Sequence, residues 1–119
     1  MKKLILIIII ILIQKNVYSN DLFDTSFINV EFTSNNIEQD KIKILENIKI
    51  KSILSIFKNI LSKEDYIDIN TYLKDDSINT FVKNIVINDE NIVNDKYFSN
   101  IKINFNKKKI IEFLKLNKL

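Results

Sequence analysis

The chain has 119 residues, of which 18 are lysine and 15 are acidic, and it contains no cysteine, histidine, glycine or proline. The absence of cysteine excludes disulfides, thiolate metal sites, cysteine nucleophiles and a lipid-modified N-terminal cysteine, and the absence of histidine removes the usual general base and the commonest metal ligand. Isoleucine, asparagine and lysine make up about half of the residues, which is typical of an A+T-rich genome and makes clusters of asparagine or lysine weak signals of function.

Residues 1–19 have the pattern of a secretory signal peptide. Two lysines follow the initiating methionine, residues 4–13 are an unbroken apolar run, and residues 17–19 place compact side chains at the −3 and −1 positions of a cleavage site. We therefore expect cleavage between Ser19 and Asn20. The apolar run would span about 15 Å as a helix, roughly half of the hydrocarbon core of a bilayer. An uncleaved membrane anchor and a buried N-terminal helix are the alternative interpretations.

Cleavage at that position changes what the charge of the chain means. It removes three of the 18 lysines and leaves 15 lysines against 15 acidic residues, so the mature protein would be neutral. The basic character of the full chain belongs to its export signal. Net charge therefore gives no argument for nucleic-acid binding.

The first predicted elements of the mature chain are a strand and a long helix. Residues 28–33 alternate between apolar and polar side chains, as a half-buried strand does. Residues 36–61 carry a broad apolar stripe with helical spacing, although their lysine–isoleucine runs also alternate with the period of a strand. We expect a helix around which the rest of the chain is organised, capped by Ser34 or Asn35. The side chains expected on its buried face are Ile42, Leu45, Ile53, Ile56, Phe57 and Ile60.

The second half of the chain predicts a connector, a short helix, a hairpin and a last helix. Residues 63–70 are charged and are expected to be a connector, and residues 75–77 open a short helix with apolar residues at helical spacing, namely Ile78, Phe81, Val82 and Ile85. Two segments with strand character meet at a turn at Asn94-Asp95, and the returning segment places five side chains on one face: Tyr97, Ser99, Ile101, Ile103 and Phe105. Asn106 is expected to cap the last helix.

Together these elements predict one α+β domain at residues 20–119. We expect a small three-stranded, mainly antiparallel sheet with helices packed on one face, in the order β-α-α-β-β-α.

The order and the amino-acid sequences of the segments resemble an exported proteobacterial family, the domain of unknown function numbered twenty-sixty-six, in a shortened form. The resemblance rests on the strand FINVEFTSN, on the helix end IFKNILSKEDY, and on the stretch from SINTFVKN to KKIIEFL with its aromatic Tyr97 and its Ile101-x-Ile103-x-Phe105 alternation. It implies export and a small α+β domain. It implies no reaction.

No catalytic, cofactor-binding or metal-ligating residue is predicted. The acidic residues Asp65, Asp68, Asp75 and Asp76 fit helix caps and a solvated connector better than a metal site, because no glycine-bearing calcium loop fits them. The lysines at 107–109 fit a solvated face better than a contact with lipid or nucleic acid.

Tyr97 and Phe98 are the candidate interaction surface. Consecutive strand residues point to opposite faces of a sheet, so both aromatic side chains cannot enter one core, and one of them is expected to be exposed or covered by a partner. The exposed sheet edge is a second candidate, because small domains bind partners by strand addition. Its alternative is an edge protected by lysine and asparagine.

The sequence therefore favours an exported periplasmic domain that acts as a non-enzymatic binding or accessory module. The expected partner is a protein of the cell envelope. No cofactor and no nucleic acid are expected, and the membrane is involved only through the N-terminal segment. An envelope protein held at the inner membrane by an uncleaved N-terminal helix is the alternative, and an enzyme of unknown class is the third.

Overall fold

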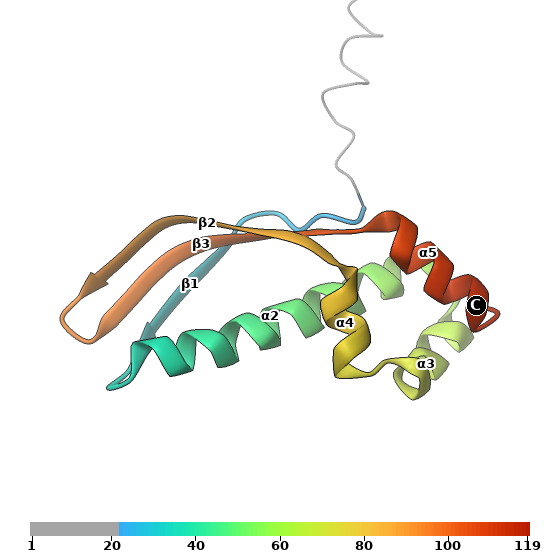
Figure 1. Ribbon diagram of the computed structural model, residues 1–119, viewed down its shortest axis with the longest axis horizontal. Helices are drawn as coiled ribbons and strands as arrows, with labels where there is room; N and C mark the ends of the chain where they lie inside the picture. The colour runs from blue at the N-terminus through green and yellow to red at the C-terminus, as the bar shows by residue number, and fades with distance from the viewer. Residues whose placement is uncertain (1–21) are drawn as a thin grey trace, which may run out of the picture.

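The computed structural model describes residues 22–119, so the predicted signal peptide and its cleavage site at Ser19 and Asn20 lie outside the described residues. The described part contains three strands and four helices (Figure 1). In chain order they are β1 (Ile28–Thr33), α2 (Ile37–Ile60), α3 (Lys63–Tyr72), α4 (Asp75–Phe81), β2 (Val82–Val93), β3 (Lys96–Phe105) and α5 (Lys107–Leu116). The predicted α+β class is confirmed, with one helix more than expected.

The three strands form an antiparallel sheet in the order β1-β3-β2. The central strand, β3, alternates strictly between buried and partly exposed residues. Its buried residues face α2, and they are the five that the sequence places on one face: Tyr97, Ser99, Ile101, Ile103 and Phe105. The periodicity of two therefore predicted correctly which face of β3 enters the core.

Helix α2 runs along one face of the sheet, while α3, α4 and α5 gather near its C-terminal end (Figure 1). The C-terminal half of α2 packs most closely, since Ile53 and Phe57 are fully buried. Ile42, which was expected on the same buried face, is 63% exposed, so its predicted burial is wrong. A straight helix crossing a twisted sheet turns different sides toward it at its two ends, which a single helical wheel does not represent.

The N-terminus of α2 also differs in detail from the expected cap. Asn36 is the N-cap, and its side-chain oxygen accepts a hydrogen bond of 3.3 Å from the backbone N–H of Gln39. Ser34 precedes the cap and stabilises it from outside the helix. Its hydroxyl donates a hydrogen bond to the carboxylate of Asp40 and accepts one from the backbone N–H of Asn36. The predicted caps, Ser34 and Asn35, were therefore placed one or two residues too early.

Residues 63–70 are part of helix α3, so their interpretation as a connector was wrong. Ser62 is the N-cap, and its hydroxyl accepts a hydrogen bond of 3.2 Å from the backbone N–H of Asp65. Asp65 lies in the first turn, where the helix dipole favours negative charge. Ile69 is fully buried and attaches α3 to the core, whereas Ile67 is 65% exposed.

Three phenylalanines from different helices hold the helical end together. Phe57 of α2, Phe81 of α4 and Phe113 of α5 lie with their ring centroids 5.1–6.3 Å apart, a spacing at which aromatic pairs attract one another. Helix α4 ends at Phe81, so Val82 and Ile85 belong to β2 and not to the short helix in which their spacing had placed them. Asn106 caps α5 as expected, through its side-chain bond to the N–H of Lys109.

Candidate functional site

The candidate residues Tyr97 and Phe98 lie on opposite faces of β3. Tyr97 faces α2 and is 1% exposed, with its ring centroid 5.0 Å from that of Phe32. Phe98 is partly exposed on the face turned away from α2, where it stands between Glu31 of β1 and Asn91 of β2. Phe98 is therefore the member of the pair that a partner could reach, and its role in binding stays a prediction.

A bulge in β2 lies beside these two residues. Asp89 and Glu90 together stand opposite the single residue Ser99 of β3. Asp89 has a φ of 54°, in the left-handed region that aspartate tolerates better than most residues. Its carboxylate accepts a hydrogen bond of 3.3 Å from Asn100 on the open face of the sheet. The bulge leaves Glu90 free to turn toward the helix, which fits the general use of bulges in re-aiming side chains.

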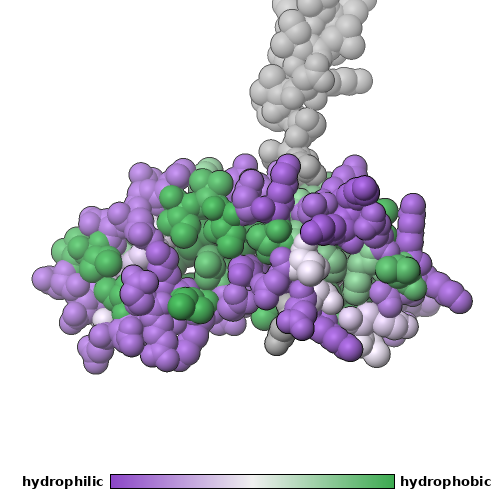
Figure 2. Space-filling model, in the orientation of Figure 1, coloured by the Kyte–Doolittle hydropathy of each residue, from purple (hydrophilic) through white to green (hydrophobic). Residues whose placement is uncertain are grey.

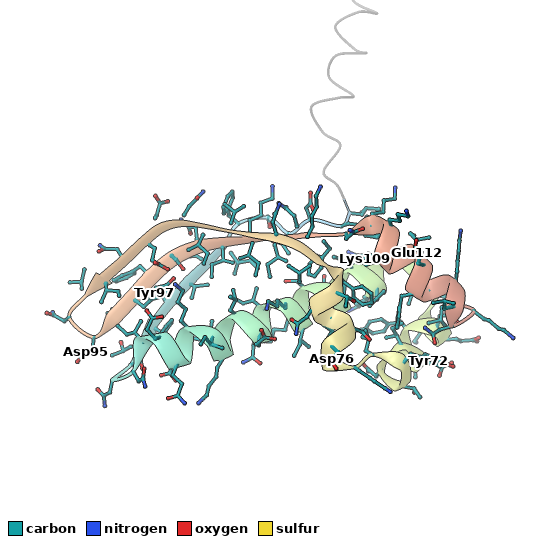
Figure 3. All side chains as sticks on the ribbon, in the orientation of Figure 1. Tyr72, Asp76, Asp95, Tyr97, Lys109 and Glu112 are labelled. Carbon is teal, nitrogen blue, oxygen red and sulfur yellow. The ribbon has the colours of Figure 1, made fainter. Side chains whose placement is uncertain are left out.

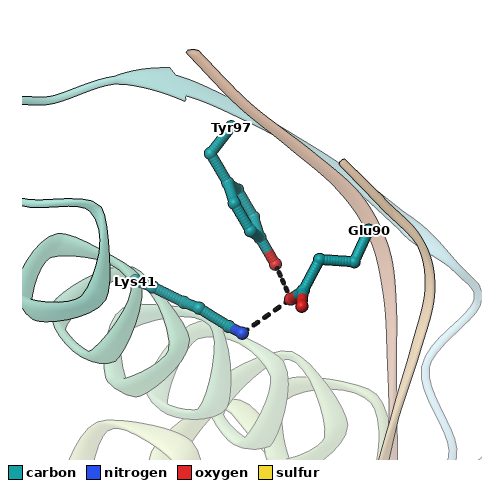
Figure 4. Close-up of polar contacts among 3 residues, drawn as sticks. All are labelled: Lys41, Glu90 and Tyr97. Atoms are coloured by element: carbon teal, nitrogen blue, oxygen red, sulfur yellow. Dashed lines mark hydrogen bonds and ion pairs between the residues drawn. The ribbon is translucent and has the colours of Figure 1, made fainter. Parts of the chain in front are cut away.

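Glu90 joins the hairpin to the long helix (Figure 4). Its Oε2 atom accepts a hydrogen bond of 2.6 Å from the hydroxyl of Tyr97 and lies 2.6 Å from Nζ of Lys41. The ammonium group of Lys41 also lies 5.5 Å from the centroid of the tyrosine ring. Strand β3, the bulge of β2 and the first half of α2 thus meet at one polar cluster, the Lys41–Glu90–Tyr97 cluster.

The electrostatics of this cluster suit a structural tether. The hydrogen bond from Lys41 lowers the pKa of Glu90, and the same bond raises the pKa of Lys41. Burial, with the hydrogen bond to Glu90 as a second cause, raises the pKa of Tyr97. All three groups therefore titrate further from neutral pH than usual, whereas acid–base catalysts and activated nucleophiles are shifted toward it.

The outer part of the hairpin is exposed along its whole length. Every residue from Ile87 to Lys96 is exposed, and Ile92 and Val93 are each 52% exposed although both are apolar. The two strands meet at a tight turn that ends at Asp95, labelled in Figure 3. Figure 2 shows hydrophobic side chains at this end of the molecule, on the left of the view. The hairpin thus presents apolar side chains to solvent at its tip.

The sheet face turned away from α2 carries two aromatic side chains, each beside a lysine. Lys96 Nζ lies 5.2 Å from the ring centroid of Phe98, and Lys102 Nζ lies 5.8 Å from that of Phe27. Phe27 is 49% exposed. Such cation–π pairs are common at protein surfaces and contribute about 0.5–1 kcal/mol where they are exposed.

Most of the acidic and basic residues weighed in the sequence lie at helix termini, whereas Asp68 lies in the middle of α3. Asp65 lies in the first turn of α3, and Asp75 and Asp76 open α4. Within residues 22–119, no three acidic side chains come together as a metal site would require. The lysines at 107–109 form the first turn of α5, and Nζ of Lys107 lies 5.6 Å from the ring centroid of Phe23.

A cavity of about 360 Å³ that the sequence did not indicate lies between the segment that precedes β1 and the C-terminal half of α2. Its walls mix polar and apolar side chains, among them Thr25, Ile28, Lys51, Ser55 and Asn59. No local signal could have revealed this cavity, because its two walls are separated by more than twenty residues of sequence.

In comparisons with known proteins, no family model, no curated protein and no solved structure matches the chain. The resemblance to the exported family therefore stays a prediction. Among the helices of residues 22–119, none is both long and apolar enough to cross a membrane.

Proposed function

We propose that this chain is an exported, non-enzymatic binding module of the periplasm, which engages a protein of the cell envelope through the outer part of the β2–β3 hairpin. One observation carries the proposal. The hairpin exposes ten consecutive residues, including the half-exposed Ile92 and Val93, and it is held against α2 by the Lys41–Glu90–Tyr97 cluster.

A tethered hairpin is a favourable binding element because little conformational freedom remains to be lost when a partner binds. Tyr97 of the hairpin is buried on the side of α2, and its hydroxyl donates a hydrogen bond to Glu90 in the bulge. Apolar side chains that are exposed on a fixed element are the kind that become the buried centre of a protein interface. Phe98 lies between β1 and β2 on the open face of the sheet, the face that also carries Val93, whereas Ile92 stands opposite Tyr97 on the other face.

The proposal that the module is not an enzyme is supported by the direction of the pKa shifts. Lys41 and Tyr97 are the two groups that could serve as a base or a nucleophile in this cluster, and both have a raised pKa. They are therefore less available as bases at neutral pH than free lysine or tyrosine.

Site-specific photocrosslinking in cells tests the proposal. A photoreactive residue at Ile92 should give a discrete adduct with an envelope protein, identified by mass spectrometry. The matched control is Ile67, an isoleucine of α3 that is 65% exposed; the same residue placed there should give no such adduct. Equal adducts from both positions would show that the hairpin is not the binding surface.

A second variant separates binding from folding. Phe98→Ala removes the partly exposed aromatic side chain and should weaken the adduct formed at Ile92 while the melting temperature stays close to that of the unmodified protein. Full recovery of the adduct in this variant would remove Phe98 from the interaction surface.

A further inference from the structure

The outer edge of β2 is a free sheet edge. Within residues 22–119 the strand order is β1-β3-β2, and β2 pairs on one side only, with β3. Figure 1 shows no other labelled element along its outer side. A strand edge of this kind carries backbone donors and acceptors that another strand can pair with.

The regular part of this edge reads the same in both directions. Register shifts interrupt β2 between Val82 and Asn84 and again between Asn88 and Asn91, which leaves Asn84–Asn88 as the regular run. That run is Asn-Ile-Val-Ile-Asn, centred on Val86, with a lysine before it and an aspartate after it. In an antiparallel pairing of two such runs about Val86, each residue therefore stands opposite a residue of the same type.

We propose that β2 pairs with β2 of a second copy of this chain, antiparallel and centred on Val86. The result is a symmetric dimer with one continuous six-stranded sheet. A two-fold axis through the pair of Val86 residues makes this interface self-complementary, as a two-fold dimer requires.

The side chains on the face of α2 agree with this register. Directly opposite residues of an antiparallel pair lie on the same face. Ile85 of one copy meets Ile87 of the other on the side of α2, since these residues stand opposite the buried Ile103 and Ile101 within each sheet. Ile87 is 36% exposed in the single chain, and the pairing covers it. Figure 2 shows a hydrophobic area along the middle of the sheet.

The charges at the two ends of the run are complementary in this register. Just beyond the regular run, Lys83 of one copy comes near Asp89 of the other, and the symmetry repeats this approach. Neither residue has an ion-pair partner within residues 22–119. The lysine, which on a lone edge would discourage pairing, here lies near a carboxylate of the other copy. The interface contains few residues, so we expect a dissociation constant on the order of micromolar.

Single cysteines test the register, because the chain contains no cysteine of its own. The full chain is purified in the form in which it accumulates in cells and is then oxidised. Val86→Cys should form a disulfide-linked dimer rapidly, since residues directly opposite each other have Cα atoms about 4.5–5.5 Å apart, within disulfide range. Asn88→Cys is the matched control on the same edge. It stands opposite Asn84 of the other copy, so its two sulfurs are far apart and crosslinking should be slow.

Opposite charges at the axis give a second test that does not depend on oxidation. Val86→Lys and Val86→Glu each place like charges opposite each other and should weaken the dimer about tenfold or more in sedimentation experiments. A mixture of the two variants pairs lysine with glutamate and should restore the dimer. Asn29→Lys, on the outer strand β1, should leave it unchanged. A monomeric unmodified protein across the micromolar range, or equal crosslinking of Val86→Cys and Asn88→Cys, would overturn the proposal.

Discussion

Glu90 accepts a hydrogen bond of 2.6 Å from the hydroxyl of Tyr97, although the glutamate lies in the bulge of an edge strand and the tyrosine lies in the core. The same carboxylate oxygen is paired with Lys41 of α2. Because this glutamate is 44% exposed, the ion pair is screened by solvent and contributes little by itself. Its main effect is geometric, since it connects the hairpin to the helix beneath it.

The first prediction concerns Glu90→Gln. The amide still accepts the hydrogen bond from Tyr97 but loses the ion pair with Lys41, so the free energy of unfolding should fall by about 0.2–1 kcal/mol. Urea denaturation at low salt measures this loss. Glu112→Gln, at an exposed glutamate of α5, is the control and should change stability less.

The second prediction is that the free energy of unfolding lost in Glu90→Gln depends on pH. The pKa of Glu90 is lowered from the 4.5 of a free glutamate, so its stabilisation is present above that pH and is lost as pH falls through the lowered pKa. The pKa values of Lys41 and Tyr97 are raised from 10.5 and 10.0, so their contributions are present below those values and are lost as pH rises through the raised ones.

Melting temperatures of the two proteins across this range measure the effect. The difference between the unmodified protein and Glu90→Gln should be largest at neutral pH and should shrink at pH values well below 4.5. An identical difference at acidic and neutral pH would contradict the assignment of the ion pair to Glu90.

The third prediction compares two isoleucines of α2. Ile56 is 6% exposed, and Ile56→Ala should lower the free energy of unfolding by about 2–5 kcal/mol through lost burial and a residual cavity. Ile42 is 63% exposed, so Ile42→Ala should change it by less than about 0.5 kcal/mol. Denaturant curves of both variants measure the difference. Equal losses of unfolding free energy in the two variants would show that Ile42 is buried as the helical wheel predicts, and would contradict the observed packing of α2.

The elements that the sequence predicted well have strong local signals. Alternation over ten residues determined the faces of β3, and an asparagine before an apolar helical pattern located the start of α5. Helix α3 also had such a signal, a serine at 62 followed by two acidic residues in the first turn, but its charged composition suggested a connector. Ile69 is the buried residue of α3, and this single apolar contact, together with the cap at Ser62, was enough to attach the helix to the core.

The polar cluster could not be predicted because it depends on long-range geometry. Lys41 and Glu90 are 49 residues apart in sequence. Their contact also requires the bulge, and the run Asn88-Asp89-Glu90-Asn91 has the composition of a turn rather than of a bulged strand. The opposite faces of Tyr97 and Phe98 were predictable, because they follow from the strand period alone. The same alternation also predicted that Tyr97 is the buried member, because Tyr97 shares its face with Ile101, Ile103 and Phe105.

The fourth prediction concerns export. The pattern of residues 1–19 leads us to expect that the form recovered from the cell envelope begins at Asn20 or within a residue or two of it. Intact-mass measurement of that form tests this directly. A mass that still includes residues 1–19 would favour the inner-membrane anchor over the free periplasmic protein.

The fifth prediction concerns the first turn of α5, where three consecutive lysines oppose the helix dipole. Lys109→Glu replaces a positive by a negative charge there and should raise the free energy of unfolding by about 0.3–1 kcal/mol. The backbone N–H of Asn106 already donates to the carbonyl of Phe81, so the new glutamate cannot complete a capping box, and the gain comes from charge alone.

The same substitution at the other end of α5 is the control. Lys115 lies in the last turn, where the dipole favours positive charge. Lys115→Glu should therefore lower the free energy of unfolding by a similar amount, although both variants change the net charge of the protein equally. Denaturation at low and high salt measures both effects, and each should shrink as salt screens the charges. A shift of the same sign at both positions would mean that overall charge, and not the dipole of α5, controls the response.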